Sequence, residues 1–333
     1  MATGPTPAEI IDNFHNGIFE CPYCELAMSL QHTHPLQMVS CPDCGNVLLV
    51  PTPVAEFWLF QVVGGGGMGF VYKAFHEIHR RSIYAIKLVP QRGKNRRRLS
   101  HSLQREAQMA TRFSGHPNIA NVVCHGWHQD EFYMASEYIR GETLTKRIER
   151  RGRLDEIEAL TIAADLVSAI RHIHSLNYLF RDVKPDNVMI NEQGLPMLFD
   201  FGLCIPCFVA ARDLGEVIEA SPVYVPPERL MGDGEGIQAE IYSLGMVLYQ
   251  MLVGTTYFAA REANSLLRQH VSEFRLHRSV TGLDSVSPDL VELITSMVCR
   301  EPDDRPQSAE GLEQTLREKL AQRVLAQQEE TAG

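Results

Sequence analysis

The sequence lacks an excess of positive charge. Its 333 residues include 31 Lys and Arg against 41 Asp and Glu, which gives a formal net charge of −10. Nucleic acids and anionic membrane surfaces bind mainly basic proteins, because their phosphates attract positive charge. The composition therefore argues against nucleic acid as the main partner and against a membrane partner.

The sequence also lacks a long apolar run. Its most apolar stretch, residues 47–63, is interrupted by Pro51, Pro53 and Glu56, so it cannot form a membrane-spanning helix. Residues 1–17 have neither the basic start nor the apolar core of a signal peptide. We therefore expect a soluble protein that is located in the cytoplasm.

Cysteine is unevenly distributed, since half of the eight cysteines fall within the first 44 residues. They form two Cys-x-x-Cys pairs, Cys21 with Cys24 and Cys41 with Cys44. The short spacing lets each turn direct two sulfurs at one ion, and two such turns supply the four thiolates of a structural zinc site. Disulfide bonding is the alternative, which a reducing cytosol disfavours. We therefore expect a zinc ribbon.

The pattern of apolar residues changes along the chain. Residues 50–55 contain two prolines and are interpreted as a stiff linker. Residues 58–90 alternate as strands do, around a glycine cluster, and helical spacing dominates after residue 140, most clearly in 154–175 and 237–253. Strands followed by helices predict an α+β fold of two lobes with a cleft between them.

The glycine cluster stands between two of the predicted strands. Gly64, Gly66 and Gly69 are followed by Val71 in the sequence VVGGGGMGFVYKA. This spacing alone also suits a dinucleotide-binding turn, which opens a helix. Here the residues after the glycines continue as a strand, which favours a glycine-rich loop between two strands.

Four further motifs follow in order. The sequence YAIK ends at Lys87, and Glu106 comes nineteen residues later in a helical stretch. FRDVKPDN occupies 180–187, DFG occupies 200–202 and PPE occupies 226–228. Together with the glycine loop, this set resembles the signature of the protein kinases, and in detail that of bacterial Ser/Thr kinases of the eukaryotic type.

The resemblance implies a bilobal protein kinase fold, in which a strand-rich small lobe precedes a helical large lobe. It extends from about residue 57 to residue 315. The predicted boundaries are 1–50 for the zinc-ribbon module with an N-terminal tail, 51–56 for the linker, 57–320 for the protein kinase domain and 321–333 for a C-terminal tail.

By resemblance, the activity is the transfer of the γ-phosphate of ATP to protein hydroxyls. Phosphoryl transfer needs positioning and charge neutralisation more than covalent help from the protein. Asp182 would accept the proton of the substrate hydroxyl, and Lys184 would neutralise charge on the γ-phosphate. Lys87 would hold the α- and β-phosphates and would itself be oriented by Glu106. The predicted catalytic residues are Asp182, Lys184, Lys87 and Glu106.

The same resemblance implies ATP and Mg²⁺ as cofactors beside a structural Zn²⁺. Asn187 and Asp200 would bind magnesium, backbone groups of Glu137 and Ile139 would bind adenine, and Ser136 would be a small gatekeeper. The predicted nucleotide-binding residues are Gly64, Gly65, Gly66, Gly67, Gly69, Val71, Ala85, Lys87, Glu137, Ile139, Asn187 and Asp200. Proteins with Ser or Thr acceptors are the expected substrates, and the zinc ribbon is expected to bind another protein or to regulate the kinase.

Two other functions stay open on the sequence. An inert kinase fold could act as a scaffold or binding protein, and a kinase could act on a small molecule. The intact Asp182, Asn187 and Asp200 favour catalysis over the first alternative. Ser221 and Pro222 stand where protein kinases place the Thr that contacts the catalytic loop, which favours protein substrates over the second.

Three positions near the motifs carry specific expectations. Phe180 replaces the usual His or Tyr and is expected to pack in the core beneath the catalytic loop. Glu240 stands where an Asp normally anchors the backbone of that loop. Glu228 of PPE is expected to form a buried ion pair with Arg305.

The segment after DFG lacks acceptors for a phosphate, because residues 203–220 contain no Ser, Thr or Tyr. In related kinases the residue equivalent to Arg181 usually binds a phosphate on this segment. We therefore predict that a carboxylate replaces it, with Glu216 or Glu219 as the candidates. Two cysteines of the segment, Cys204 and Cys207, form either a redox-sensitive pair or simply two buried thiols.

Overall fold

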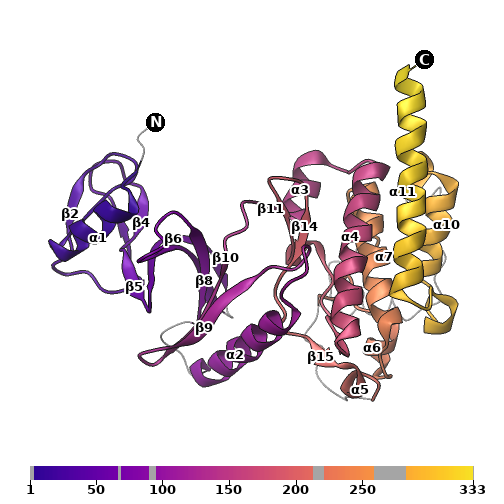
Figure 1. Cartoon of the computed structure of the whole chain (residues 1–333), viewed down its shortest axis with the longest axis horizontal. Coiled ribbons are helices and arrows are strands. Elements are labelled where there is room, and N and C mark those ends of the chain that lie inside the picture. The colour runs from indigo at the N-terminus through magenta and orange to yellow at the C-terminus, as the bar shows by residue number, and fades with distance from the viewer. Residues whose placement is uncertain (1–3, 67–68, 90–94, 213–220, 259–282, 333) are drawn as a thin grey trace. The chain divides into compact units, whose positions relative to one another are not determined.

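The computed structural model describes residues 4–66, 69–89, 95–212, 221–258 and 283–332. The chain divides into two compact units (Figure 1). The first unit holds Met1–Thr111 and Asn121–Tyr138, and the second holds Arg112–Ala120 and Ile139–Gly333. Among the described residues, no helix combines the length and the apolar character that crossing a membrane requires.

The first unit is built around an antiparallel sheet of six strands in the order β5-β6-β7-β8-β10-β9. Alternating apolar residues form these strands, and the glycine cluster provides the turn between β6 and β7. The strands are β5 (Thr52–Val54), β6 (Phe57–Gly66), β7 (Gly69–His76), β8 (Ile83–Leu88), β9 (Val122–His128) and β10 (Glu131–Glu137), and the helices are α1 (Pro7–His15) and α2 (Arg96–Phe113).

One face of this sheet is covered by the two helices. Alternation along β8 places Lys87 on this face, together with Met134, its partner on β10. Buried residues of α2 pack here against the sheet in a cluster of Val89, Leu103, Ala107, Phe132 and Met134. At the other end of the same face, Ile11 of α1 packs with Trp58 and Phe75. Lys87 lies between these two apolar clusters and is only half-buried, so a polar side chain is tolerated there.

The opposite face is covered by residues that precede the sheet in the sequence. We define the four-Cys module as residues 17–50. Its two hairpins join β1 (Ile18–Glu20) to β2 (Ala27–Ser29) and β3 (Met38–Ser40) to β4 (Val47–Leu49). Leu36 and Leu49 of the module pack into the sheet's main core, which is made of Val54, Phe57, Leu59, Tyr72, Ala74, Ile86, Leu88, Tyr133 and Ala135. The module is therefore an integral part of the first unit.

The segment predicted as a stiff linker, residues 51–56, contains strand β5 instead. Val54 pairs with Phe57, and Pro53 pairs with Trp58. Because β5 is an edge strand of the sheet, Pro53 does not interrupt a ladder on both sides. The Thr52 hydroxyl also accepts a hydrogen bond from the backbone N–H of Leu36 over 2.9 Å. Backbone pairing and this bond tie the four-Cys module to the sheet.

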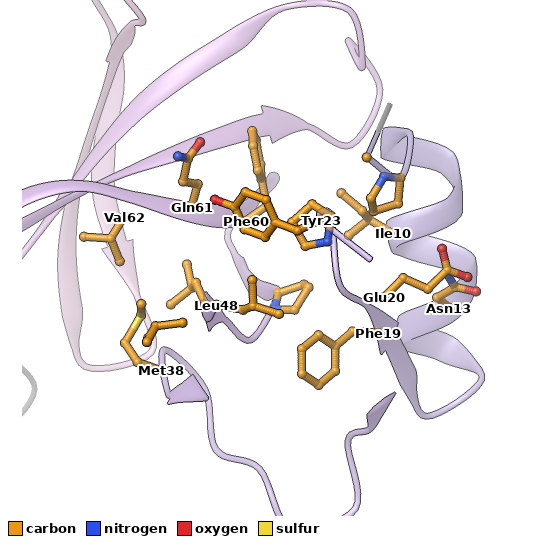
Figure 2. A pocket seen from close by; sticks show the side chains of 16 residues that line it. Ile10, Asn13, Phe19, Glu20, Tyr23, Met38, Leu48, Phe60, Gln61 and Val62 are labelled. Carbon is orange, nitrogen blue, oxygen red and sulfur yellow. The ribbon is translucent and has the colours of Figure 1, made fainter. Parts of the chain in front are cut away.

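A pocket of about 390 Å³ lies where α1, the four-Cys module and β6 meet (Figure 2). Ile10 of α1, Phe19 and Leu48 of the module and Phe60 of β6 line it. Its place beside β6, beyond the short pairing with β5, shows that the module covers part of a sheet edge as well as a face.

The second unit is mainly helical. Two of its long helices match the predicted segments 154–175 and 237–253, which confirms those predictions. Its helices are α3 (Leu144–Arg151), α4 (Glu156–Ser175), α5 (Cys207–Ala210), α6 (Pro227–Met231), α7 (Ile237–Val253), α10 (Pro288–Met297) and α11 (Ala309–Ala332), with short 3₁₀ turns η1 (Pro185–Asn187), η2 (Leu283–Ser285) and η3 (Pro302–Asp304). Its strands are β11 (Gly141–Thr143), β12 (Tyr178–Leu179), β13 (Val188–Asn191), β14 (Pro196–Leu198) and β15 (Ile205–Pro206).

Helix α7 forms the centre of this unit, because it is apolar around most of its circumference and almost wholly buried. Helix α4 packs against it and is capped at its start by Asp155, whose side chain accepts a hydrogen bond from the N–H of Glu158. Helix α11 lies along α4 (Figure 1) and extends through the expected C-terminal tail to Ala332. This packing supports the loops between β12 and β15 that carry the catalytic motifs.

Candidate functional site

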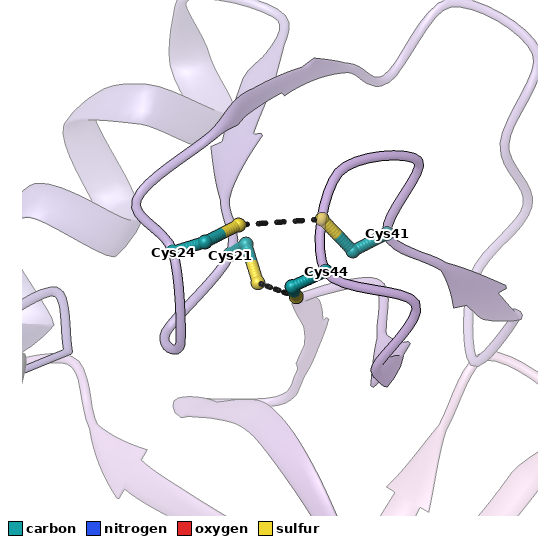
Figure 3. Close-up of side chains that lie close together, drawn as sticks. All are labelled: Cys21, Cys24, Cys41 and Cys44. Atoms are coloured by element: carbon teal, nitrogen blue, oxygen red, sulfur yellow. Dashed lines mark hydrogen bonds between the residues drawn. The ribbon is translucent and has the colours of Figure 1, made fainter.

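The four sulfurs of Cys21, Cys24, Cys41 and Cys44 come together at the tips of the two hairpins (Figure 3). All lie within 4.8 Å of one another, with 3.6 Å from Cys21 Sγ to Cys44 Sγ and 3.5 Å from Cys24 Sγ to Cys41 Sγ. A disulfide needs about 2.0 Å between its sulfurs. Four thiolates about 2.3 Å from one zinc ion are about 3.8 Å apart, so the cluster suits a metal.

The two Cys-x-x-Cys turns have the same backbone structure. In one, the N–H of Glu25 donates to the carbonyl of Cys21, and in the other the N–H of Gly45 donates to the carbonyl of Cys41, both over 2.9 Å. Glu25 and Gly45 have φ values of 62° and 73°, which let the chain turn back sharply after the second sulfur. Two equivalent turns facing each other explain why four sulfurs surround one point.

One thiol of the cluster is prepared to ionise. The backbone N–H of Asn46 and, next, its side-chain amide lower the pKa of Cys44 to about 6. The side-chain bond runs from Nδ2 of Asn46 to Sγ of Cys44 over 3.2 Å. Both bonds stabilise the thiolate form of Cys44, which is the form that binds a metal.

The glycine-rich turn joins β6 to β7 in the first unit. Gly66 pairs with Gly69, and the predicted site residue Gly67 lies outside the described residues. Gly69 has a φ of 149°, and a Cβ atom there would come within 2.5 Å of the carbonyl oxygen of Leu88. Only glycine fits at this position, so the turn brings bare backbone close to the strand that carries Lys87.

Three predicted nucleotide contacts share a face of the same sheet. Val71 on β7 is the direct partner of Lys87 on β8, and Ala85 lies two residues before Lys87. All three are half-buried. The structure thus brings together the apolar and the basic residues that the sequence placed at this site.

Lys87 forms an ion pair with Glu106 of α2. Its Nζ lies 2.7 Å from Oε1 and 2.8 Å from Oε2 of the carboxylate. Glu106 follows the buried Leu103 by three residues, so both point from α2 toward the sheet. The Lys87 side chain is 20% exposed and that of Glu106 8%, so solvent reaches the pair mainly from the side of the lysine.

The predicted hinge begins where β10 ends. The backbone N–H of Glu137 donates to the carbonyl of Asn121 over 3.1 Å, and that of Tyr138 donates to Ile83 over 3.3 Å. The gatekeeper candidate Ser136 pairs with Ala85 of β8. The boundary between the two units falls within this predicted hinge. Glu137 belongs to the first unit, and the half-buried Ile139 belongs to the second.

In the second unit, Asp182 is the centre of a compact polar group. Its Oδ2 accepts one hydrogen bond from Nζ of Lys184 and one from Nδ2 of Asn187, each over 2.7 Å. Asn187 also donates to the backbone carbonyl of Asp182 over 3.0 Å. The turn η1 makes these contacts possible, because it folds Asn187 back toward the start of the loop.

Asp200 lies at the same end of a hairpin as Asn187. Val188, the first residue of β13, pairs with Leu198, the last of β14, and the N–H of Phe199 donates to the carbonyl of Asn187 over 3.1 Å. Asp200 itself has a φ of 66°, which costs a non-glycine residue about 1–2 kcal/mol. Strain of this kind is concentrated at functional sites, where the surrounding structure enforces it.

The two departures from the kinase pattern have clear structural roles. Phe180 is fully buried and packs edge to face on Phe201 with 5.5 Å between ring centroids, as predicted. Glu240 anchors the catalytic loop, since its Oε1 accepts a hydrogen bond from the backbone N–H of Arg181 over 2.7 Å. Its Oε2 is buried without a hydrogen-bond partner among the described residues. Burial raises the pKa of Glu240 to about 7.

The predicted ion pair between Glu228 and Arg305 is confirmed. Its two contacts measure 2.8 Å and 2.9 Å, and both side chains are buried. The guanidinium also donates to the carbonyls of Gln238, Cys299 and Arg300 and stacks on a buried tyrosine ring, so every part of it is used. This pair fastens helix α6 to the loop before α11.

The partner of Arg181 is a residue that the sequence analysis missed. Glu216 and Glu219, which were predicted for this role, lie outside the described residues. In the structure, Nη2 of Arg181 donates to Oε1 of Glu235 over 2.6 Å. Glu235 occurs in the glycine-rich sequence GDGEG, which is typical of an exposed turn, so no sequence signal marks it as buried.

The structure favours the simpler interpretation of Cys204 and Cys207. Both are free thiols, and Cys204 is buried with its Sγ 3.6 Å from the carbonyl oxygen of Phe180. Burial raises the pKa of Cys207. A thiol with a raised pKa forms little of the reactive thiolate, so Cys207 is poorly reactive, and the buried Cys204 has the character of a small apolar residue.

Comparisons with known proteins agree with this geometry. Residues 57–317 match the protein kinase domain family. The chain is 31% identical over 262 residues to the serine/threonine-protein kinase PrkC of Bacillus subtilis (strain 168), which covers 79% of this chain and 40% of PrkC. It is 28% identical over 267 residues to the serine/threonine-protein kinase pkn3 of Myxococcus xanthus, which covers 77% of this chain and 48% of that protein.

A third relative is the probable serine/threonine-protein kinase PknB of Lactococcus lactis subsp. lactis (strain IL1403), with 26% identity over 245 residues. This match covers 74% of the chain and 38% of PknB. The chain thus spans less than half the length of each of these three relatives. The family match includes both the strand-rich and the helical unit, as the α+β prediction required. The chain belongs to the protein kinase family.

Proposed function

We propose that the chain is an ATP-dependent serine/threonine protein kinase that transfers the γ-phosphate of ATP to protein hydroxyls. The observation that carries this proposal is the polar group around Asp182, in which Lys184 and Asn187 both bind one carboxylate oxygen. An inert scaffold gains little from an aspartate held in this way, whereas a base that accepts a proton from a substrate needs a fixed geometry.

Asp182 is the proposed general base. Lys184 and Asn187 bind its Oδ2, which leaves Oδ1 as the oxygen to accept the proton of a substrate hydroxyl. Fixing the carboxylate in this way avoids reorganisation when the reaction starts, which is how positioned bases accelerate proton transfer. Lys184 stays beside the carboxylate, where its charge would also favour a phosphate.

Asn187 and Asp200 are the proposed magnesium ligands, and their chemistry fits this role because Mg²⁺ prefers oxygen ligands. The amide nitrogen of Asn187 binds Asp182, so its Oδ1 is the atom that remains to bind a cation. A bound magnesium ion would neutralise charge on phosphate oxygens. Lys87 belongs to the first unit, where Glu106 holds it, and it would bind the phosphate oxygens of ATP.

Serine and threonine are the proposed acceptors for two reasons. The three relatives described above bear the name serine/threonine-protein kinase. The sequence also has Lys184 two residues after Asp182, a lysine that tyrosine kinases usually lack.

The proposal is tested by incubating the purified chain with labelled ATP, Mg²⁺ and a generic basic protein, beside an Asp182→Asn variant. We expect label on protein serine or threonine and a loss of about 10²–10⁴-fold in the variant, the usual contribution of a general base. The thermal melt should be unchanged. A wild-type chain that labels no protein would support the scaffold, and label found only on a small molecule would support the small-molecule kinase.

We further propose that the four-Cys module binds one structural zinc. Support comes from the four converging sulfurs and from the lowered pKa of Cys44. Leu36 and Leu49 reach from this module into the sheet core, which favours an effect of zinc on the kinase over a purely separate binding role.

Metal analysis of the purified chain tests the zinc proposal. We expect about one zinc per chain, and none in Cys41→Ser, because a structural site needs its four ligands. Cys299→Ser is the matched control, since Cys299 lies outside the cluster and donates to the carbonyl of Thr295, which serine can also do. A wild-type chain that is folded and free of zinc would remove this idea.

A further inference from the structure

Arg181, the residue before Asp182, is held by its backbone. Its φ of 69° lies in the left-handed region, which an arginine adopts only at a cost. Its N–H donates to Oε1 of Glu240 over 2.7 Å, and its carbonyl accepts a hydrogen bond from Nη1 of Arg229, also over 2.7 Å. These two bonds fix the peptide that leads into Asp182.

Glu235 joins the side chains of the two arginines. Its Oε1 accepts a hydrogen bond from Nη2 of Arg181 over 2.6 Å, and its Oε2 accepts from Nε and Nη2 of Arg229 over 2.8 Å and 2.5 Å. The Glu235 side chain is 3% exposed and that of Arg229 7%. A carboxylate this buried is not exchanged for solvent anions, and without it two cations would lose their counter-charge.

The backbone around Glu235 is also tightly placed. Its N–H donates to the carbonyl of Ala210, the last residue of α5, over 2.7 Å. A Cβ atom on the preceding Gly234 would come within 2.6 Å of the carbonyl oxygen of Ala211. Glycine at 234 therefore permits a close approach to the segment after DFG, and this approach sets the position of the Glu235 carboxylate.

We propose that Glu235 is a positioning residue that supplies the negative charge that Arg181 binds, in place of a phosphate on the segment after DFG. The catalytic loop is then ordered in the unphosphorylated chain. Residues 203–220 contain no Ser, Thr or Tyr, so that stretch offers no acceptor for such a phosphate. Glu235 lies outside the stretch, between α6 and α7, and needs no modifying enzyme. The inference rests on the proposed kinase function.

The test compares the full chain with Glu235→Gln, Glu235→Asp and the control Glu156→Gln, all treated with phosphatase and checked by intact mass. Glu156 is a matched control, because it too is a shielded carboxylate paired with an arginine, Arg323, over 2.6 Å. The measured quantities are kcat, the KM for ATP, the thermal melt and hydrogen exchange of residues 178–190.

We expect the dephosphorylated wild-type chain to keep its kcat. Glu235→Gln should lower kcat by about 100-fold with little change in the KM for ATP, the size of effect that a misplaced catalytic group produces. Glu235→Asp keeps the charge and should recover part of the loss. Hydrogen exchange of 178–190 should become faster in Glu235→Gln alone, and Glu156→Gln should match the wild type. Adding Arg181→Gln to Glu235→Gln should lower kcat no further, because both act through one contact.

Three results would overturn the inference: a wild-type kcat in folded Glu235→Gln, loss of wild-type activity on dephosphorylation, or unchanged exchange of the catalytic loop. If Glu235→Gln does not fold, Glu235→Asp and Arg181→Gln carry the same comparison. A wild-type chain without phosphotransfer counts against the proposed function, while the exchange data still decide whether Glu235 positions the loop.

Discussion

Two ion pairs between a basic residue and a glutamate, one from each unit, differ in how exposed the cation is. In the strand-rich unit, Lys87 binds Glu106 and remains 20% exposed. In the helical unit, Arg305 binds Glu228 with no exposure of its side chain, and three backbone carbonyls take its other N–H groups. The first cation is partly exposed to solvent, and the second is buried and fully committed to the fold.

An ion pair between a basic residue and a glutamate can thus orient a side chain at a proposed site or stabilise the fold. The pair of Lys87 with Glu106 lies between exposed and fully buried, so its loss should cost less stability than the loss of a pair that is buried on both sides. A buried pair is costly to break, because the remaining partner keeps an uncompensated charge. Substitutions in the two pairs should therefore separate activity from stability.

The largest effect on stability is expected for Glu228→Gln. The substitution leaves Arg305 buried and charged, so the free energy of unfolding should fall by about 3–5 kcal/mol. Glu313→Gln is the control, since its partners Arg171 and Arg317 are 51% and 48% exposed and each such pair contributes about 0–1 kcal/mol. Urea unfolding of both variants gives the comparison. Equal losses in the two variants would contradict the assigned role of the buried pair.

Lys87→Met should lower the activity strongly and the stability only slightly, which is the reverse of Glu228→Gln. We expect kcat/KM to fall by about 10²–10³-fold, as when one stabilising donor is removed from an active site. The protein should remain folded, because methionine fills the space of the lysine stem. Lys319→Met, which breaks the pair with Asp289 on the helical unit, is the control and should keep its activity. Retained phosphotransfer in Lys87→Met would show that this lysine does not bind phosphate.

A smaller effect is expected for Glu240, another buried carboxylate, to which no cation of the described residues is directly bonded. Burial raises its pKa from the usual 4.5 to about 7, so the folded state prefers the protonated form. The unfolded chain releases this proton at lower pH, and the contribution to stability is therefore lost as pH rises from about 4.5 to about 7. Each pKa unit corresponds to about 1.4 kcal/mol, so the loss of stability over this range is about 3 kcal/mol.

Glu240→Gln cannot ionise and should remove this part of the pH dependence. The measurement is the free energy of unfolding at about pH 4 and about pH 8 in the wild type and the variant, since these values bracket the window from the unfolded to the folded pKa. We expect the difference between the two pH values to shrink by about 3 kcal/mol in the variant. Identical pH profiles would mean that Glu240 ionises normally within the fold.

Residues that take part directly in the proposed chemistry were predictable from the sequence. Lys87, Asp182 and Asp200 each stand in a short motif, because the chemistry fixes both the residue type and its neighbours. The ion pair of Glu228 with Arg305 could be predicted for the same reason, although 77 residues separate the partners.

Residues that position the motif residues, or that pack against the sheet, without belonging to a motif were not predictable. Glu235 contacts Arg181 across 54 positions, and a lone acid among glycines gives no sign of burial. The burial of Leu36 and Leu49 likewise depends on which surface they meet. Pro53 suggested a linker, because proline is rare in strands, yet an edge strand tolerates it.

Leu36 and Leu49 pack on the sheet from outside the family match. The boundary of the family match and the boundary of the apolar core therefore differ. The family match begins at residue 57, whereas the apolar core of the first unit includes residues from before that point. A shortened protein that starts at Phe57 would expose Leu59, Tyr72 and Ile86 to water. Exposed apolar patches of this kind promote aggregation. We therefore expect a protein that is cut at the family boundary to be less soluble than one that keeps the four-Cys module.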